Sequence, residues 1–181
     1  MLVCAALVGA SLACDLAVGG PTPPGPAIPV STEAAGELQD IWKAALANST
    51  SGEVGVTITE EQLTSYLAYK LEAQADPPLR DPQVYLRDGK IFIYGTAKAA
   101  NVSTTALIAV ALVVTNDGSL SFSIEQADFG PLPVPEKLLS SVSAALNEAF
   151  TGQFGSLASG FKISNAAIAD GQMTIVGSVT R

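Results

Sequence analysis

The sequence predicts a single α+β domain in which a mainly antiparallel sheet packs on helices. Asp-Gly pairs at 88–89, 117–118 and 170–171 each lie between short runs in which apolar and polar residues alternate. Such pairs favour tight hairpin turns, so each one predicts two antiparallel strands. Three other segments carry apolar residues at helical spacing. The expected order is helix, strand, helix, about four strands, helix and two strands, which indicates an α+β domain.

The three expected helices each present one apolar face. The first covers residues 32–48, and the third covers 135–150 with Pro135 at its first position. The second begins at the sequence TEEQ, residues 59–62, which has the pattern of a capping box. Apolar faces of this kind are buried on folding, so we expect the helices to pack against the sheet.

One strand of the expected sheet is apolar on both faces. It covers residues 102–115, and within it the run ALIAVALVV at 106–114 contains no polar side chain. An antiparallel sheet commonly exposes one face to water, so a strand of this kind needs cover on both sides. Either different helices cover the two faces, or one face lines a groove of small and branched apolar side chains that suits an acyl chain. The run is too short for a membrane-spanning helix, which needs about 20 residues.

Charge and composition exclude several functional classes. The net charge is −8 and the sequence has no basic cluster, which argues against a nucleic-acid partner. The chain has no His, the commonest general base and metal ligand. Its two cysteines, Cys4 and Cys14, both precede the domain. The domain is therefore expected to have no disulfide, no thiolate nucleophile and no cysteine zinc site.

The carboxylates have structural explanations and form no recognisable catalytic or metal-binding motif. Glu60 and Glu61 lie at a helix start, where they complement the helix dipole. Asp88, Asp117 and Asp170 belong to the expected turns. A Ser nucleophile would need a Lys base in a chain without His. We therefore expect no enzyme, no cofactor and no catalytic or metal-binding residues; an enzyme would require two carboxylates that meet only in the folded chain.

The N-terminal segment predicts export and a lipid anchor. Residues 1–13 form an uncharged apolar run that is too short to span a bilayer and fits the apolar part of a signal peptide. The run ends in Ser-Leu-Ala-Cys at 11–14, which resembles the lipobox of bacterial lipoproteins. This resemblance implies that Cys14 becomes the N-terminus and carries at least two acyl chains, such as palmitate. The alternative is an ordinary secretory signal in which Cys14 has no role.

Residues 14–31 are expected to hold the anchor and a spacer. The stretch at 18–31 is rich in Gly and Pro and shows neither helical nor alternating spacing, which is typical of semi-extended linkers. The expected organisation is a signal segment at 1–13, a lipidated Cys14 with its spacer, and one α+β domain at 32–181. We expect an exported protein that is anchored on the extracytoplasmic side of a membrane.

Four segments of the domain resemble the YpmS-like and LmeA-like envelope proteins, which are related to tubular lipid-binding (TULIP-like) domains. They are VTITEEQLTSYL (56–67), DPQVYLRDGKIFIYG (81–95), GPLPVPEKLL (130–139) and DGQMTIVG (170–177). The resemblance implies a curved, mainly antiparallel sheet of about six to seven strands, packed as a half-barrel on two to three helices. It also implies that the helix at 135–150 lies in the concave face of the sheet. The groove between them would be lined by Ile108, Val110, Leu112, Phe122, Ile124, Leu139, Val142 and Leu146.

Two functions follow from these observations. The first is a membrane-anchored protein of the cell envelope that binds a lipid or another long apolar ligand in the groove between sheet and helix. The alternative is a non-catalytic structural or protein-interaction module of the envelope, which predicts a filled interior and an exposed apolar patch of several hundred Å². The sequence leaves the oligomeric state open.

Overall fold

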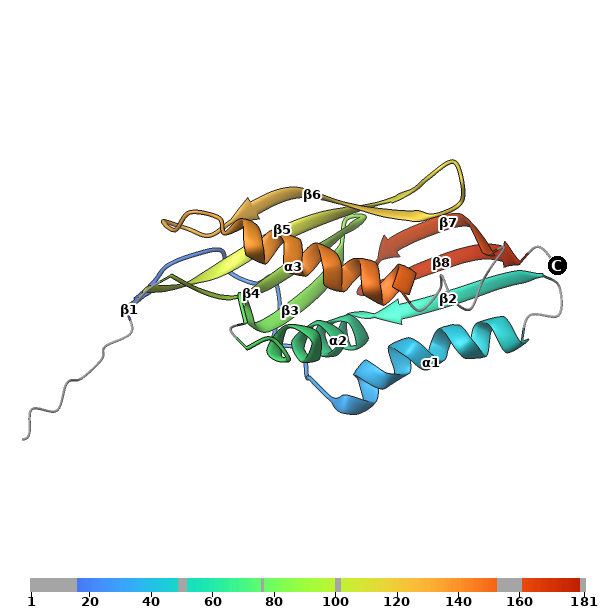
Figure 1. Cartoon of the computed structure of the whole chain (residues 1–181), viewed down its shortest axis with the longest axis horizontal. Coiled ribbons are helices and arrows are strands. Elements are labelled where there is room, and N and C mark those ends of the chain that lie inside the picture. The colour runs from blue at the N-terminus through green and yellow to red at the C-terminus, as the bar shows by residue number, and fades with distance from the viewer. Residues whose placement is uncertain (1–15, 49–51, 76, 100–101, 153–160, 180–181) are drawn as a thin grey trace, which may run out of the picture.

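The computed structural model describes residues 16–48, 52–75, 77–99, 102–152 and 161–179, and Figure 1 shows their arrangement. The helices are α1 (Thr32–Asn48), α2 (Glu60–Glu72) and α3 (Glu136–Asn147), and a π-helical turn, η1 (Glu148–Gly152), directly follows α3. The strands are β1 (Leu16–Val18), β2 (Glu53–Thr59), β3 (Arg80–Arg87), β4 (Lys90–Ala99), β5 (Val102–Val114), β6 (Leu120–Asp128), β7 (Phe161–Ala169) and β8 (Gln172–Val179). The expected α+β class and order of elements are confirmed, and β1 precedes them as an unexpected strand.

The strands form two sheets that do not close into a barrel. The larger sheet has the order β1-β5-β4-β3, with β6 also paired to β5, and the smaller sheet has the order β2-β8-β7. The pairing of β1 with β5 is parallel, and the others are antiparallel. The two sheets meet end to end, because Gly171 N in the β7–β8 turn donates to Leu86 O of β3 at 3.1 Å. We expected these strands to form one sheet, and the structure divides them between two sheets.

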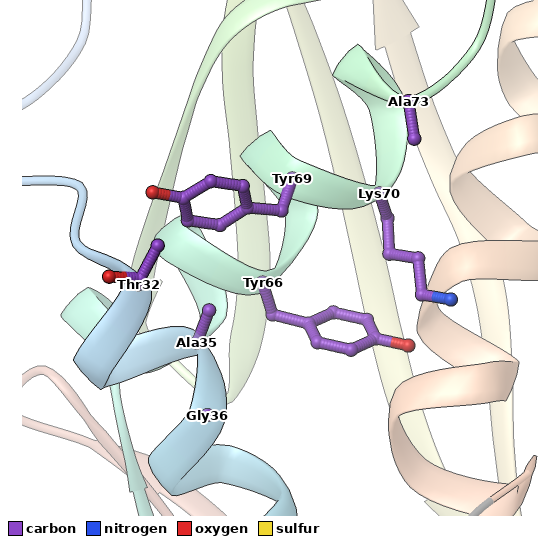
Figure 2. Close-up of a pocket in the computed structure, with 7 residues that line it drawn as sticks. All are labelled: Thr32, Ala35, Gly36, Tyr66, Tyr69, Lys70 and Ala73. Carbon is purple, nitrogen blue, oxygen red and sulfur yellow. The ribbon is translucent and has the colours of Figure 1, made fainter.

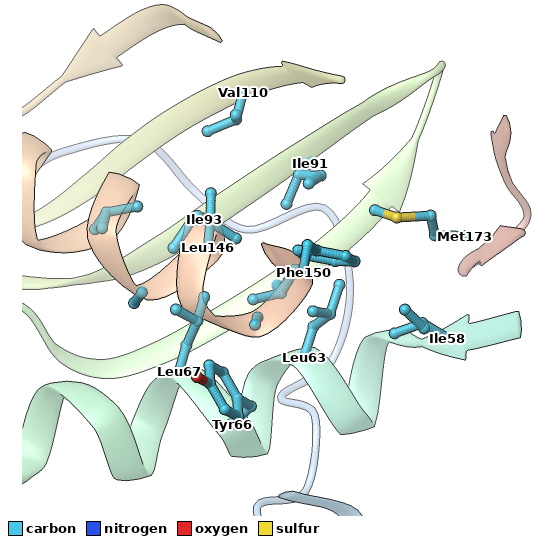
Figure 3. Close-up of a cluster of buried hydrophobic side chains, with 14 of the residues drawn as sticks. Ile58, Leu63, Tyr66, Leu67, Ile91, Ile93, Val110, Leu146, Phe150 and Met173 are labelled. Carbon is cyan, nitrogen blue, oxygen red and sulfur yellow. The ribbon is translucent and has the colours of Figure 1, made fainter. Parts of the chain in front are cut away.

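The helices cover one face of the larger sheet, which we call the inner face. Figure 1 shows α3 lying along this face, with α2 beside it and α1 packed on α2. Ile93 and Ile108, partners on β4 and β5, are fully buried together with Leu146 of α3. Figure 3 shows Leu146 and Phe150 gathered with Ile91 and Ile93 in this cluster. The interior beneath α3 is thus packed with apolar side chains.

An N-terminal strap lies across the opposite, outer face of the larger sheet. We use this name for residues 19–31, which follow β1 directly. The Tyr85 hydroxyl of β3 donates to the carbonyl oxygen of Pro26 at 3.0 Å. Ile28 N donates to Gln83 Oε1, and Gln83 Nε2 donates back to Ile28 O at 3.3 Å. The described part of the expected spacer is therefore attached to the sheet by hydrogen bonds.

The strap also explains how the doubly apolar strand β5 is covered. Tyr85, Tyr94 and Leu107 form a buried cluster on the outer face, and Ile28 of the strap packs against it together with Phe92. The rings of Tyr85 and Tyr94 meet edge to face, with centroids 5.7 Å apart. Helices thus cover the inner face of β5, and the strap contributes cover to the outer face.

Gly20 of the strap packs tightly against β5. A Cβ atom at this position would lie 2.2 Å from Thr105 O and 2.7 Å from Thr104 Oγ1. We expect Gly20→Ala to lower the free energy of unfolding by about 1–3 kcal/mol, because the strap must shift away from the sheet. Urea denaturation measures the change. The matched control is Gly19→Ala, since a Cβ there would have no atom within 4 Å; equal losses from both variants would contradict this role for the close contact.

Candidate functional site

Beside α3, the apolar core reaches the surface along β6. Leu112 of β5, Phe122 and Ile124 of β6, and Leu139 of α3 are half-buried and pack against the core cluster. The ring centroids of Phe122 and Phe150 lie 5.0 Å apart, so this side of α3 and η1 faces β6. Leu139 lies on the same side as Phe150, because their separation is about three helical turns. We call the strip formed by Leu112, Phe122, Ile124 and Leu139 the seam.

All eight residues that were expected to line a ligand groove belong to or pack against one apolar cluster, but they differ in exposure. The four that are fully buried are Ile108, Val110, Val142 and Leu146. The other four are the half-buried residues of the seam. The structure therefore separates residues that are already packed from residues that a ligand can reach without displacing α3. Their role in ligand binding stays a prediction.

The position of β6 explains why the seam is open. In the described sheet, β6 pairs with β5 and forms that edge. Phe122 and Ile124 point toward α3, whereas Ser121 and Ser123 alternate with them and are exposed. Helix α3 packs against β6, and beyond β6 the described sheet has no further strand. The apolar row on β6 is therefore covered by α3 and β5 but open on its outer side, and it stays half-buried.

An open pocket of about 390 Å³ lies between α1 and α2 (Figure 2). It is lined by Thr32, Ala35, Gly36, Tyr66, Tyr69, Lys70 and Ala73. Lys70 Nζ lies 2.5 Å from Glu148 Oε1 and 5.9 Å from the centroid of the Tyr66 ring. The carboxylate balances the ammonium charge, so Lys70 offers little attraction to an anion. None of these residues was predicted from the sequence as a site residue. The small neighbours Ala35 and Gly36 were the available signal for space beside α2.

Tyr66 at this pocket is expected to remain neutral up to strongly alkaline pH. Burial, with the negative charge of Glu148 as a second cause, raises the pKa of the Tyr66 phenol to about 12. Unfolding returns the phenol to a pKa of about 10. The unfolded chain therefore loses this proton first, and the stability contributed by the neutral phenol is lost as the pH rises from about 10 to 12.

Ultraviolet absorbance of the ionised phenol tests this expectation. The difference between the wild-type and Tyr66→Phe titrations isolates Tyr66 from Tyr85 and Tyr94, whose pKa values burial also raises. The difference curve should have its midpoint near pH 12. Glu148→Gln should move that midpoint downward, because it removes the second cause. A midpoint near 10 in the native protein would contradict the burial of this phenol.

The described residues contain no group of three or more carboxylates that could hold a metal ion. Glu60, one of the acids at the start of α2, accepts a hydrogen bond from Leu86 N at 2.7 Å and another from the Arg87 guanidinium.

Within the described part of the chain, no helix is both long and apolar enough to cross a membrane. Cys14 and the expected signal segment at 1–13 lie outside the described residues.

The fold and the seam together define an α+β protein whose apolar core opens beside one helix. The model of a family described as LmeA-like phospholipid-binding matches residues 28–178, which include α1–α3, β2–β7, all of β8 except Val179, and the whole seam. The chain belongs to this LmeA-like family. A search of curated proteins gave no match.

Proposed function

We propose that the protein binds a phospholipid in the cell envelope and holds an acyl chain in the seam between β6 and α3. The half-buried apolar strip above a packed core carries this proposal, and the phospholipid-binding description of the family supports the ligand class. Burial of apolar groups contributes about 0.8 kcal/mol per methylene. An acyl chain that lies along the seam would therefore gain binding energy and would complete the cover of Phe122, Ile124 and Leu139.

The direction of the seam suits an extended chain. β6 runs toward the start of α3, and α3 runs back beside it. Leu132 and Leu139 lie near the start of α3, and the Phe122–Phe150 ring pair lies toward its other end. The interior beneath the seam is already filled by Val110, Val142 and Leu146. These features support an acyl chain that lies along the surface of the core, with the headgroup in water.

We propose further that the protein is exported and attached to a membrane through acyl chains on Cys14. The apolar segment at 1–13 and the lipobox-like sequence that follows it support this attachment. Metabolic labelling with an alkyne analogue of palmitate should label the wild-type chain and not Cys14→Ser. Equal labelling of the two chains would reject lipidation at this residue.

Binding rather than catalysis is the proposed activity. The chain has no His, and two of the described acids already have structural partners. Glu60 is bonded to β3, and hydrogen bonds from Thr115 and Ser119 lower the pKa of Asp117 in the β5–β6 turn. A carboxylate whose pKa is lowered, such as that of Asp117, is a poor general acid or base near neutral pH.

Native mass spectrometry tests the binding function. The full chain carrying Cys14→Ser avoids the covalent lipid and is purified without harsh detergent. We expect one phospholipid to remain bound, and the emptied protein should take up a fluorescent phospholipid. A protein that is consistently empty and takes up none would overturn the proposal and would favour the protein-interaction module.

A further inference from the structure

The β6–α3 connection forms an exposed apolar loop at one end of the molecule. We call residues 130–135, with the sequence GPLPVP, the tip loop. Pro131, Pro133 and Val134 are exposed, and Leu132 is half-buried against the core. No residue of the tip loop is charged. Val134 is one of the few large apolar side chains that the described residues expose.

The tip loop is held in a defined shape. Phe129 anchors its start in the core with 2% of its surface exposed. Gly130 N donates to Asp128 Oδ1 at 2.9 Å, and Leu132 N donates to Phe129 O at 3.1 Å. Its three prolines fix further backbone angles. A loop that is ordered in advance loses little conformational entropy when it meets another surface.

β1, the first described strand, lies at the same end of the molecule as the tip loop (Figure 1). Leu16 of β1 pairs with Val102, the first residue of β5. Just after β1, the carbonyl oxygen of Gly19 lies 2.6 Å from the position that a Cβ on Gly130 would occupy. The start of the tip loop and the residue that follows β1 are therefore neighbours.

Cys14 precedes Leu16 by two residues, and an extended chain advances at most about 3.6 Å per residue. The strap follows β1, and its hydrogen bonds hold it on the sheet. The described part of the expected spacer therefore adds no free length between Cys14 and the domain. A lipid on Cys14 would hold this end of the molecule against the bilayer. This step rests on the proposed lipid anchor.

We propose that the tip loop contacts the apolar part of a lipid bilayer and directs the open end of the seam toward it. The contact is apolar, because the loop has no charge and the chain as a whole carries −8. The loop leads directly into α3, so Leu132 and Leu139 stand where a lipid would pass from the bilayer into the seam. The occupant of this surface is a membrane, from which the protein takes its ligand.

Tryptophan quenching by brominated phospholipids tests the contact. Val134→Trp and Val113→Trp are made in the full chain with Cys14 intact, and each is mixed with vesicles of phosphatidylglycerol and phosphatidylethanolamine that carry bromine on their acyl chains. Val113 is the matched control, because it is also an exposed valine, 52% exposed, and lies at the other end of β5. The native Trp42 is 1% exposed, so the wild-type chain gives the background.

We expect the added emission of Val134→Trp to be quenched several-fold more strongly than that of Val113→Trp. Equal quenching, or none at position 134, would overturn the tip contact. Two independent measurements, flotation of the wild-type chain with the vesicles and native mass spectrometry of Cys14→Ser, report anchoring and lipid binding. An unquenched tip in a chain that floats and carries phospholipid would reject this inference alone. A quenched tip in a chain that carries no lipid would support the membrane contact and reject the binding function.

Discussion

Glu60→Gln is expected to lower the free energy of unfolding by about 2–3 kcal/mol, because it removes a charge that is bonded to two groups of β3. The Glu60 carboxylate accepts from Leu86 N at 2.7 Å and from the Arg87 guanidinium, and 17% of its side chain is exposed. Glu60 N also donates to Gly171 O at 3.2 Å. One residue thus links the start of α2, the end of β3 and the β7–β8 turn, where the two sheets meet. Urea denaturation followed by circular dichroism measures the loss.

Glu61→Gln is the matched control for this change. Glu61 occupies the same first turn of α2 but is exposed, so its loss removes an interaction with the helix dipole of about 0.3–1 kcal/mol. The two substitutions alter charge and size equally. Equal destabilisation would show that the bonds of Glu60 to β3 contribute nothing beyond the dipole.

The same pair of acids shows what the sequence can and cannot predict. The TEEQ sequence predicted the capping box correctly, because the bonds between Thr59 and Gln62 involve residues three positions apart. The turns at Asp88-Gly89 and Asp170-Gly171 were also predicted, and all four residues have the positive φ that such turns need. Whether Glu60 or Glu61 reaches β3 depends on how α2 packs on the sheet. From the sequence alone, the helix dipole therefore explained Glu60 and Glu61 equally, and the two acids were not distinguished.

The strap was missed for a similar reason. A Pro- and Gly-rich stretch has the same composition whether it is a free linker or an extended segment laid on a sheet. The contacts that distinguish the two cases join residues far apart in sequence, such as Ile28 with Gln83 and Gly19 with Thr104. The apolar run of β5 did indicate that both faces need cover, but not which segment supplies it.

For the residues of the candidate groove, the sequence indicated which residues share a face of a strand, but not how deeply each side chain is buried. Alternation put Val110 and Leu112 on one face of β5, and Phe122 and Ile124 on one face of β6, and the family resemblance implied that the helix at 135–150 covers them. All four belong to or pack against the apolar cluster that also contains residues of α3. Burial then depends on the position of each strand in the sheet. Val110 lies on β5, which has β4 on one side and β6 on the other, whereas Phe122 and Ile124 lie on the edge strand and are half-buried. That distinction needs the order of strands in the sheet.

Leu139→Lys is expected to weaken phospholipid binding at least about tenfold, which corresponds to about 1.4 kcal/mol. Leu139 is half-buried on the side of α3 that faces β6, so an acyl chain in the seam would meet the new ammonium group. Burying an unpaired charge beside an acyl chain is costly. The fold should tolerate the change, because the lysine stem can extend along the seam and leave the charge in water. Titration with a fluorescent phospholipid measures the affinity, and thermal unfolding checks the fold.

Ser140→Lys adds the same charge to the next residue of α3, which is exposed and whose hydroxyl donates to Lys137 O in its own helix. It should bind phospholipid as the wild type does.

If Leu139→Lys also binds normally, the acyl chain lies outside the seam, and the open pocket between α1 and α2 becomes the next site to test. Gly36→Leu tests that pocket, because Gly36 lines it, a Cβ at Gly36 would have no atom within 4 Å, and leucine favours the helix more than glycine does. Loss of binding in Gly36→Leu and not in Leu139→Lys would move the site from α3 to α1, whereas the opposite pattern assigns it to the seam.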